Sequence, residues 1–258
     1  MNAMHMVGRR ILAVVGTMTV LVATSISASI GTGQAATTQA GSQFAVRSIE
    51  PAAGSKVGVA YPVIVTFATP VGDRAAAERG IRITAPGHTV GHFEWTGDDT
   101  VQWVPDNYWT PNSRIDVTVH GMSTGFETGD KVLGLADISD HTFTVSVNGE
   151  ILRVMAASMG KPKRPTPIGS FTALSKERTI KFDSRTIGIP LNDPEGYLLN
   201  GEYAVRVTWS GVYVHSAPWS VNSQGYSNVS HGCINLSPDD AAWYFDTVHL
   251  GDPIVVQA

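Results

Sequence analysis

TFTVSVNGEILRVM, residues 142–155, carries the clearest structural signal in this chain of 258 residues. Apolar and polar side chains alternate on both sides of the pair Asn148-Gly149. Alternation of this kind is typical of a strand with one buried face. A two-residue Asn-Gly connection favours a type I′ turn, because both central residues of that turn need positive φ. The segment therefore predicts a β-hairpin and a mainly β fold around it.

The C-terminal half continues this pattern and adds one helix. Further strands are expected at residues 180–182, 212–215 and 254–256. Ser237 can cap a helix whose first position suits Pro238, and the two aspartates that follow favour the positive end of the helix dipole. The helix is expected to continue through residues 241–248 and to end at Gly251. Residues 123–258 are therefore interpreted as a mostly β domain with at least one α-helix.

Residues 36–122 form a separate β pattern. Short alternating runs are separated by turn-forming Gly, Pro, Asp and Asn. The expected strands lie at residues 44–49, 62–67, 81–83, 92–95, 101–104 and 115–119. This spacing suggests a small immunoglobulin-like β-sandwich without a catalytic constellation. A segment richer in Gly and Asp, residues 123–139, is the expected junction between the domains.

Polar and aromatic side chains of the sandwich are interpreted as structural. His88, His92 and Asp98 are expected to be scattered surface groups rather than metal ligands. Three tryptophans are expected to pack in a core or between domains rather than to bind sugars: Trp95, Trp103 and Trp109.

Residues 1–35 look like an export signal. Arg9 and Arg10 precede an apolar run, residues 11–23, and small residues follow at 33–35. This order is typical of a cleaved secretory signal. The alternative is an uncleaved N-terminal anchor, because residues 11–30 are barely long enough to cross a bilayer at about 1.5 Å per residue. Either interpretation places the protein outside the cytoplasm, in the periplasm or cell wall.

Charge and cysteine content narrow the class of protein further. Without the two arginines of residues 1–35, the chain keeps 16 basic and 22 acidic side chains, a formal charge of −6. A nucleic acid or an anionic membrane as partner would call for a basic patch instead. The single cysteine excludes an internal disulfide, so burial alone must hold the fold together.

That cysteine, Cys233, lies in SHGCIN, residues 230–235. A lone cysteine is ordinarily a small buried hydrophobe. The neighbours here favour a reactive thiol instead. Gly232 lets the backbone turn tightly and lets another molecule approach, and His215, at the end of a predicted strand, lies one loop away. A nearby imidazolium lowers a thiol pKa from about 8.5, so we expect thiolate at neutral pH.

These residues resemble the catalytic domain of the L,D-transpeptidases (YkuD-like). The family pattern is a His, a short gap, then Ser/Thr-His-Gly-Cys-hydrophobic-Asn, and His215 with residues 230–235 meets every position. A second family element, Thr-Pro-x-Gly-x-Phe, stands at residues 166–171 as TPIGSF. The resemblance covers about residue 125 to the C-terminus. It is strongest to actinobacterial, mycobacterial-type members, in which a bacterial immunoglobulin-like domain precedes the catalytic domain.

The resemblance implies acyl transfer in peptidoglycan maturation. Cys233 would attack the carbonyl between meso-diaminopimelate and the terminal D-alanine of a tetrapeptide stem, release D-alanine and leave a thioester. The side-chain amine of a second stem would then attack and form a 3→3 cross-link. The implied partners are these stem peptides, with carbapenem β-lactams as inhibitors. No cofactor, metal or nucleic acid is implied.

The resemblance also implies roles around the thiol. His215 takes the thiol proton, and the backbone carbonyl of Ser216 holds its other ring nitrogen. Backbone N–H groups of Gly232 and Cys233, with His231, are candidates to hold the tetrahedral oxyanion. The expected substrate-binding residues are Tyr197, Ser210, Gly211, Asn235, Ser230 and Phe182. For the aromatic pair and for Ser210-Gly211, the alternatives are packed side chains and a hairpin turn.

Other functions remain open on the sequence. One alternative is that His215, His231 and Cys233 ligate zinc, although a His and a Cys two apart suit a tetrahedral site poorly. A cell-wall binding module that has lost catalysis is a second alternative, against which the intact motif counts. An L,D-carboxypeptidase, with water in place of the acceptor amine, would use the same acyl-enzyme.

Overall fold

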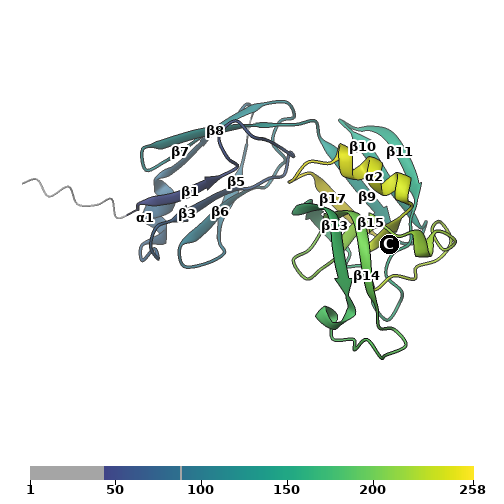
Figure 1. Ribbon diagram of the computed structural model, residues 1–258. Coiled ribbons are helices and arrows are strands. Elements are labelled where there is room, and N and C mark those ends of the chain that lie inside the picture. Colours follow the sequence, from purple (N-terminus) through teal and green to yellow (C-terminus); the bar gives the residue numbers. More distant parts are fainter. Residues whose placement is uncertain (1–43, 88) are drawn as a thin grey trace, which may run out of the picture. The chain divides into compact units, whose positions relative to one another are not determined.

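The computed structural model describes residues 44–87 and 89–258 (Figure 1). The predicted signal or anchor therefore lies outside the described residues. Over the described ranges the chain is mainly β, with four sheets and two α-helices, as the sequence predicts for the fold class. No helix in this part of the chain is long and apolar enough to span a membrane.

The first domain consists of two four-stranded sheets. One has the order β1 (Val46–Glu50), β3 (Val63–Phe67), β6 (Thr100–Pro105) and β5 (Gly91–Trp95). The other has the order β2 (Lys56–Val57), β8 (Met122–Thr128), β7 (Arg114–Val119) and β4 (Ile81–Thr84). Alternate residues of β3 and β7 are buried, and both sheets contribute to one apolar core. The predicted immunoglobulin-like sandwich is confirmed.

Trp109 and Trp103 pack in this sandwich core, as predicted. Trp109 is buried, its ring lies 5.1 Å from that of Trp103, and its Nε1–H donates to the carbonyl of Tyr61 at 2.8 Å. The exposed His92 lies on the surface, 2.6 Å from a carboxylate oxygen of Asp106. Trp95 stacks on Phe67, and the exposed Asp98 pairs with Arg74. His88 lies outside the described residues.

Two features of the first domain differ from the sequence prediction. A short helix, α1 (Arg74–Arg79), interrupts the strands, because Asp73 accepts a hydrogen bond from the Ala76 N–H and three alanines follow the cap. Strand β8 begins at the predicted boundary of 122/123 and pairs with β7 and β2. The sandwich therefore extends to Thr128, and the Gly- and Asp-rich segment forms strands rather than a linker.

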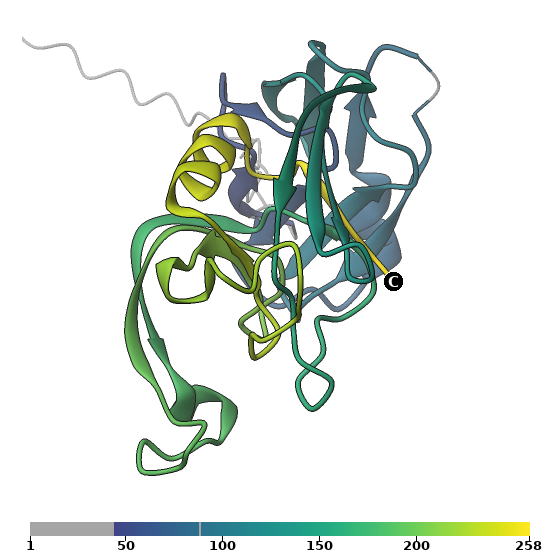
Figure 2. The same cartoon turned by 90° about the vertical axis from the view of Figure 1, so that its right-hand side faces the viewer.

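The second domain also has two sheets. A five-stranded sheet has the order β11 (Glu150–Ala156), β10 (Thr142–Val147), β9 (Val132–Asp137), β17 (Pro253–Gln257) and β12 (Gly169–Thr172). A four-stranded sheet has the order β13 (Ser175–Asp183), β14 (Leu198–Arg206), β15 (Tyr213–Ser216) and β16 (Ile234–Leu236). Figures 1 and 2 show the long hairpin of β13 and β14 projecting from the rest of this domain.

The turn and the helix cap predicted from the sequence of the second domain are both present in the structure. Asn148 and Gly149 have φ values of 52° and 92°, and β10 and β11 pair on either side of them. Ser237 caps helix α2 (Pro238–Thr247), its hydroxyl accepting from the Asp240 N–H at 3.2 Å. The helix ends at Thr247 because the next residue is extended, so Gly251 lies in a turn beyond the helix rather than at its cap.

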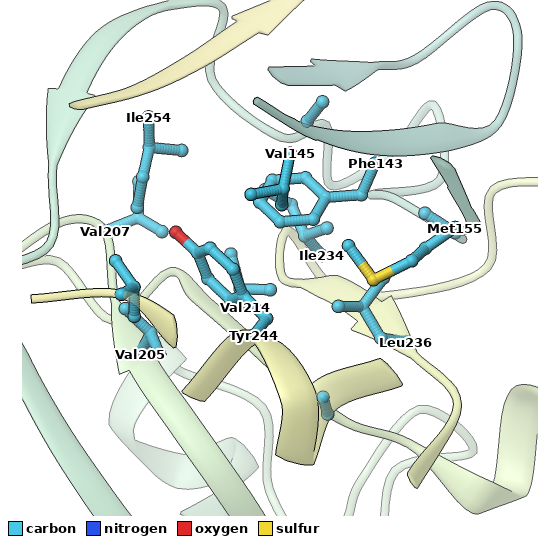
Figure 3. Close-up of a cluster of buried hydrophobic side chains, with 14 of the residues drawn as sticks. Phe143, Val145, Met155, Val205, Val207, Val214, Ile234, Leu236, Tyr244 and Ile254 are labelled. Atoms are coloured by element: carbon cyan, nitrogen blue, oxygen red, sulfur yellow. The ribbon is translucent and has the colours of Figure 1, made fainter. Parts of the chain in front are cut away.

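The core of the second domain holds the strands that carry the motif residues. Figure 3 shows Val214, Ile234 and Leu236 packed with Tyr244 of α2, whose ring meets Phe143 edge-on at 4.8 Å. Each fully buried aliphatic side chain of this kind contributes about 1.5–3 kcal/mol relative to its exposed state. Strands β15 and β16 are therefore anchored in the apolar core of this domain.

Candidate active site

Strands β15 and β16 bring the separated halves of the motif together. They pair in parallel, with Val214 opposite Ile234 and His215 opposite Asn235. Cys233 is the last residue before β16, so the thiol lies at the start of the strand that pairs with the one carrying the imidazole. Both side chains line one cavity of about 670 Å³.

The walls of this cavity come from three segments. These segments are the β13–β14 hairpin with its connecting loop, the turn before β15 together with β15 itself, and residues 229–235, and Lys161 and Trp219 add single side chains. Ser216 and Gly232 are not among the lining residues. The predicted site residues that line the cavity are Cys233, His215, His231, Ser230, Asn235, Tyr197, Ser210, Gly211 and Phe182.

His215 is oriented by a backbone carbonyl. It is 3% exposed, and its Nδ1 lies 2.7 Å from the carbonyl oxygen of Ser216. A carbonyl can only accept, so Nδ1 carries the hydrogen and Nε2 of the neutral ring is left as a base. The Phe182 ring packs 4.5 Å from the imidazole on one side. Burial lowers the pKa of His215 to about 4, despite the opposing hydrogen bond to Ser216.

The thiol is also neutral at pH 7. Burial raises the pKa of Cys233 to about 11, against a smaller opposing effect of a backbone hydrogen bond from Tyr213. Its Sγ lies 3.8 Å from the carbonyl oxygen of Gly211. The expected thiolate–imidazolium pair is therefore not the resting state, because the apolar surroundings disfavour both charges. A neutral thiol must lose its proton to Nε2 as it attacks.

The loop of the SHGCIN motif, residues 230–233 (the motif loop), is held in shape by the Ser230 side chain. Its hydroxyl donates to the Cys233 carbonyl at 2.6 Å and accepts from the Gly232 N–H at 3.0 Å. The Gly232 N–H is thus already engaged, contrary to its expected part in an oxyanion site. In the described residues the backbone N–H groups of His231 and Cys233 make no hydrogen bond. Gly232 itself is needed for its φ of 121°, which other residues rarely adopt.

Asn235 also has a bracing contact rather than a free amide. It is 3% exposed, and its Nδ2 donates to the Ser220 hydroxyl at 3.1 Å. Ser220 closes the short 3₁₀ helix η2 (Pro218–Ser220), which carries Trp219 to within 5.9 Å of the His215 ring. Asn235 therefore fixes the loop through this contact and also lines the cavity.

The rim residues predicted from the family pattern have ordinary structural roles as well. Ser210 and Gly211 form a turn in which the Thr208 and Ser210 hydroxyls lie 2.9 Å apart and Gly211 has a φ of 104°. The Tyr197 ring lies 5.0 Å from the His231 ring. These side chains face the cavity and are packed at the same time.

An ion pair across the cavity was not predicted. Glu195, in the β13–β14 loop, accepts from Lys161 Nζ at 2.6 Å and from Lys163 Nζ at 3.3 Å. Lys161 Nζ also lies 3.3 Å from Nε2 of His231. The two lysines hold the pKa of Glu195 down at about 2, so its carboxylate stays charged near neutral pH. No sequence signal marks the pair, because β12 and β13 separate the lysines from Glu195 along the chain.

The predicted zinc alternative has no support in the geometry. Across the described residues, no group of three or more His, Cys, Asp and Glu side chains is arranged to hold a metal ion. His215 Nδ1 is committed to a carbonyl, and Nε2 of His231 faces a lysine ammonium group. Both contacts are poor surroundings for a divalent cation.

Known proteins match both domains. The L,D-transpeptidase catalytic domain family (YkuD) matches residues 131–256, and the bacterial Ig domain family matches residues 19–124. L,D-transpeptidase 1 of Mycobacterium tuberculosis is 69% identical over 211 residues, which cover 82% of this chain and 84% of that relative. These matches confirm the family resemblance.

Solved structures agree. That of the L,D-transpeptidase LdtMt1 in complex with imipenem has a TM-score of 0.79 and 68% identity, covering 83% of this chain and 99% of that one. The structure of L,D-transpeptidase 3 from Mycobacterium tuberculosis in complex with a faropenem-derived adduct has a TM-score of 0.77 and 48% identity. The match covers 83% of this chain and 99% of that one. The chain therefore belongs to the L,D-transpeptidase family, cysteine enzymes with a YkuD catalytic domain, here preceded by a bacterial Ig domain.

Proposed function

We propose that this L,D-transpeptidase forms 3→3 cross-links in peptidoglycan through a thioester on Cys233. The donor is a tetrapeptide stem, and the bond that breaks joins meso-diaminopimelate to D-alanine. The observation that carries the proposal is that Cys233, directly before β16, and His215, on the paired strand β15, both line one cavity, with the imidazole tautomer set by Ser216.

The first half-reaction forms the acyl-enzyme. Nε2 of His215 takes the proton from Sγ of Cys233 while the sulfur attacks the donor carbonyl. The negative charge that develops on the carbonyl oxygen is stabilised by the free backbone N–H groups of Cys233 and His231. The protonated His215 then gives its proton to the nitrogen of the leaving D-alanine as the C–N bond breaks.

The second half-reaction uses the same groups in reverse order. The side-chain amine of an acceptor stem attacks the thioester carbonyl, and His215 takes a proton from that amine. The tetrahedral intermediate collapses with cleavage of the C–S bond, and the proton returns to the thiol. The low pKa of His215 suits this exchange, because the imidazole is neutral and ready to accept at pH 7.

Carbapenems and penems are proposed to acylate the same thiol. Two of the similar structures hold imipenem and a faropenem-derived adduct. In this chain Cys233 lines a cavity of about 670 Å³. A cavity of this volume has room for a fused bicyclic ligand. The reaction would open the β-lactam C–N bond and place the released proton on its nitrogen.

Export to the cell wall completes the proposal. Peptidoglycan stems lie outside the cytoplasmic membrane, and the N-terminal sequence predicts a signal or an anchor. Fusion of residues 1–43 to a reporter that is active only after export would test this. A reporter that stays inactive in the cytoplasm would contradict the assignment.

A product assay tests the reaction itself. Purified protein is incubated with a disaccharide-tetrapeptide, and the products are identified by mass, with Cys233→Ala as the control. We expect a dimer joined through two diaminopimelate residues together with free D-alanine. A tripeptide without dimer would indicate L,D-carboxypeptidase activity instead. Unchanged substrate would contradict both, and it would favour a non-catalytic wall-binding module.

A further inference from the structure

Thr166, in the second sequence motif, is in contact with the motif loop. Its side chain is 2% exposed, and its hydroxyl donates to the Gly232 carbonyl at 2.9 Å. The same oxygen accepts from the Gly160 N–H, also at 2.9 Å. A hydroxyl has one hydrogen, so these two bonds fix its direction: the hydrogen is aimed at Gly232.

The peptide group that Thr166 holds is the one that ends in the Cys233 N–H. Among the described residues the only cis peptide precedes Pro51, so this peptide is trans, with C=O and N–H pointing in opposite directions. Thr166 is not among the residues that line the cavity, whereas Cys233 is. Holding the carbonyl on the buried side therefore turns the Cys233 N–H toward the cavity.

Nothing else in the loop restrains this peptide in the same way. Gly232 has a φ of 121° and no Cβ, so the peptide that follows it has more rotational freedom than most. The Cys233 N–H makes no hydrogen bond within the described part of the chain. If the peptide rotated, the Gly232 carbonyl oxygen would face the cavity and repel an oxyanion.

The segment before Thr166 is built to keep the hydroxyl in place. Residues 158–160 pair with the motif segment through bridges from Ser158 to Asn235 and from Gly160 to Ser230. A Cβ on Gly160 would collide with the backbone of Arg164 and Thr166, so only glycine allows this approach. The hydroxyl is thus tied to the same backbone that carries the nucleophile.

We infer that Thr166 is a positioning residue for acyl transfer: its hydroxyl holds the Gly232–Cys233 peptide so that the Cys233 N–H is available to the oxyanion. The inference rests on the proposed thioester chemistry at Cys233. Thr166 touches neither substrate nor the reacting atoms, so its effect should appear only in reactions that form an oxyanion.

Two reactions of the same thiol separate this role from a structural one. Attack on the imipenem carbonyl passes through a tetrahedral oxyanion, with the S–C bond forming and the C–N bond then breaking. Alkylation by iodoacetamide is a direct displacement, in which an S–C bond forms, iodide leaves and the thiol proton passes to solvent. Only the first reaction needs the Cys233 N–H.

The experiment measures both rate constants for the full-length protein and for Thr166→Val and Thr166→Ser. Complete loss of one oxyanion donor typically costs about 10²–10³-fold. For a misaligned donor in Thr166→Val we expect a loss of about 10- to 100-fold in acylation, with alkylation changed less than about twofold. Thr166→Ser keeps the hydroxyl and should restore acylation to near the wild-type rate.

Each contrary result overturns the inference. Equal losses in both reactions would show that Thr166 acts on the thiol or on the fold. Unchanged acylation in Thr166→Val would show that the peptide is held without the hydroxyl. If Thr166→Val does not fold, Thr166→Cys, with a weaker donor of similar size, replaces it under the same criteria. Failure of the wild-type protein to react with imipenem while iodoacetamide still labels Cys233 would refute the proposed chemistry instead.

Discussion

His215 donates its Nδ1–H to the carbonyl oxygen of Ser216 at 2.7 Å, so a main-chain group orients the base. A Ser-His-Asp triad uses a carboxylate at this point. A carbonyl carries no full charge and stabilises an imidazolium less. This weaker support agrees with the low pKa of His215, about 4, for which burial is the main cause.

The first prediction concerns that pair. Ser216→Ala should keep most transpeptidase activity, because the carbonyl and not the hydroxyl contacts the ring. His215→Gln should lose about 10²–10⁴-fold, since an amide cannot shuttle a proton. Turnover of the disaccharide-tetrapeptide measures both. A folded Ser216→Ala enzyme as inactive as His215→Gln would make the hydroxyl part of the catalytic unit.

The second prediction concerns the resting thiol. With a pKa of about 11, only about one Cys233 in 10⁴ is thiolate at pH 7. Alkylation by iodoacetamide should therefore be slow at pH 7 and rise about tenfold per pH unit up to pH 10. Labelling rates followed by mass across this range provide the measurement. A rate that is already flat between pH 6 and 8 would indicate a preformed thiolate–imidazolium pair.

The third prediction concerns stability in acid. The pKa of His215 is lowered from 6.5 in the unfolded chain to about 4, so below pH 6.5 the unfolded state binds more protons. Stability should therefore fall as the pH drops from 6.5 toward 4. At about 1.4 kcal/mol per pKa unit, the loss from this group is on the order of 3 kcal/mol.

His215→Gln removes this contribution. Denaturant unfolding of both proteins at pH 7 and pH 4 gives the decrease in the free energy of unfolding for each. The decrease should be larger for the wild-type protein than for the variant. The comparison of differences cancels the carboxylates, which titrate in both proteins. Equal losses would mean that His215 is not buried in neutral form.

The fourth prediction concerns the ion pair across the cavity. Glu195→Gln keeps a side chain of the same size but removes the charge that attracts Lys161 and Lys163. The loop of the β13–β14 hairpin should open more often, which we expect to raise KM several-fold with less effect on kcat. Limited proteolysis should also cut the loop faster.

The same hairpin offers a matched control. Glu202 pairs with Arg178 at 3.6 Å, with both side chains 53% exposed and outside the cavity rim. Glu202→Gln should leave KM and proteolysis unchanged, because exposed pairs contribute only about 0–1 kcal/mol. Identical behaviour of the two variants would show that the Glu195 pair does not hold the loop.

The fifth prediction concerns the domain division. Every residue that lines the cavity lies between Lys161 and Asn235. A fragment of residues 130–258 should therefore still be acylated by imipenem. The fragment begins at residue 130 rather than 123 because residues 123–128 belong to β8, whose sheet partners lie in the first domain. Mass spectrometry detects the adduct. A folded 130–258 fragment that never forms it would assign part of the site to the first domain.

Features with a local cause were predictable from the sequence. The Asn148-Gly149 turn follows from the positive φ that both residues adopt, and helix α2 follows from its Ser237 cap and Pro238. The family was predictable for a similar reason. Its motif is a fixed order of residue types, His215 followed by residues 230–235, and the pairing of β15 with β16 brings the two parts together.

Features set by partners distant in sequence were not predictable. Strand β16 has three residues, all buried, so it has no alternation to detect. Strand β8 was hidden because most of it lies in residues 123–139, a segment richer in Gly and Asp than its neighbours. The same holds for the ion pair of Glu195 with Lys161.

The sequence by itself therefore determined which residues carry the chemistry, because motif chemistry depends on residue type and order. Only the tertiary structure decided their state. Burial makes both the Cys233 thiol and the His215 imidazole neutral, since low-polarity surroundings disfavour charge. Hydrogen bonds from Ser230 and Thr166 decide which backbone N–H groups stay free, because each donor and acceptor has a limited number of partners.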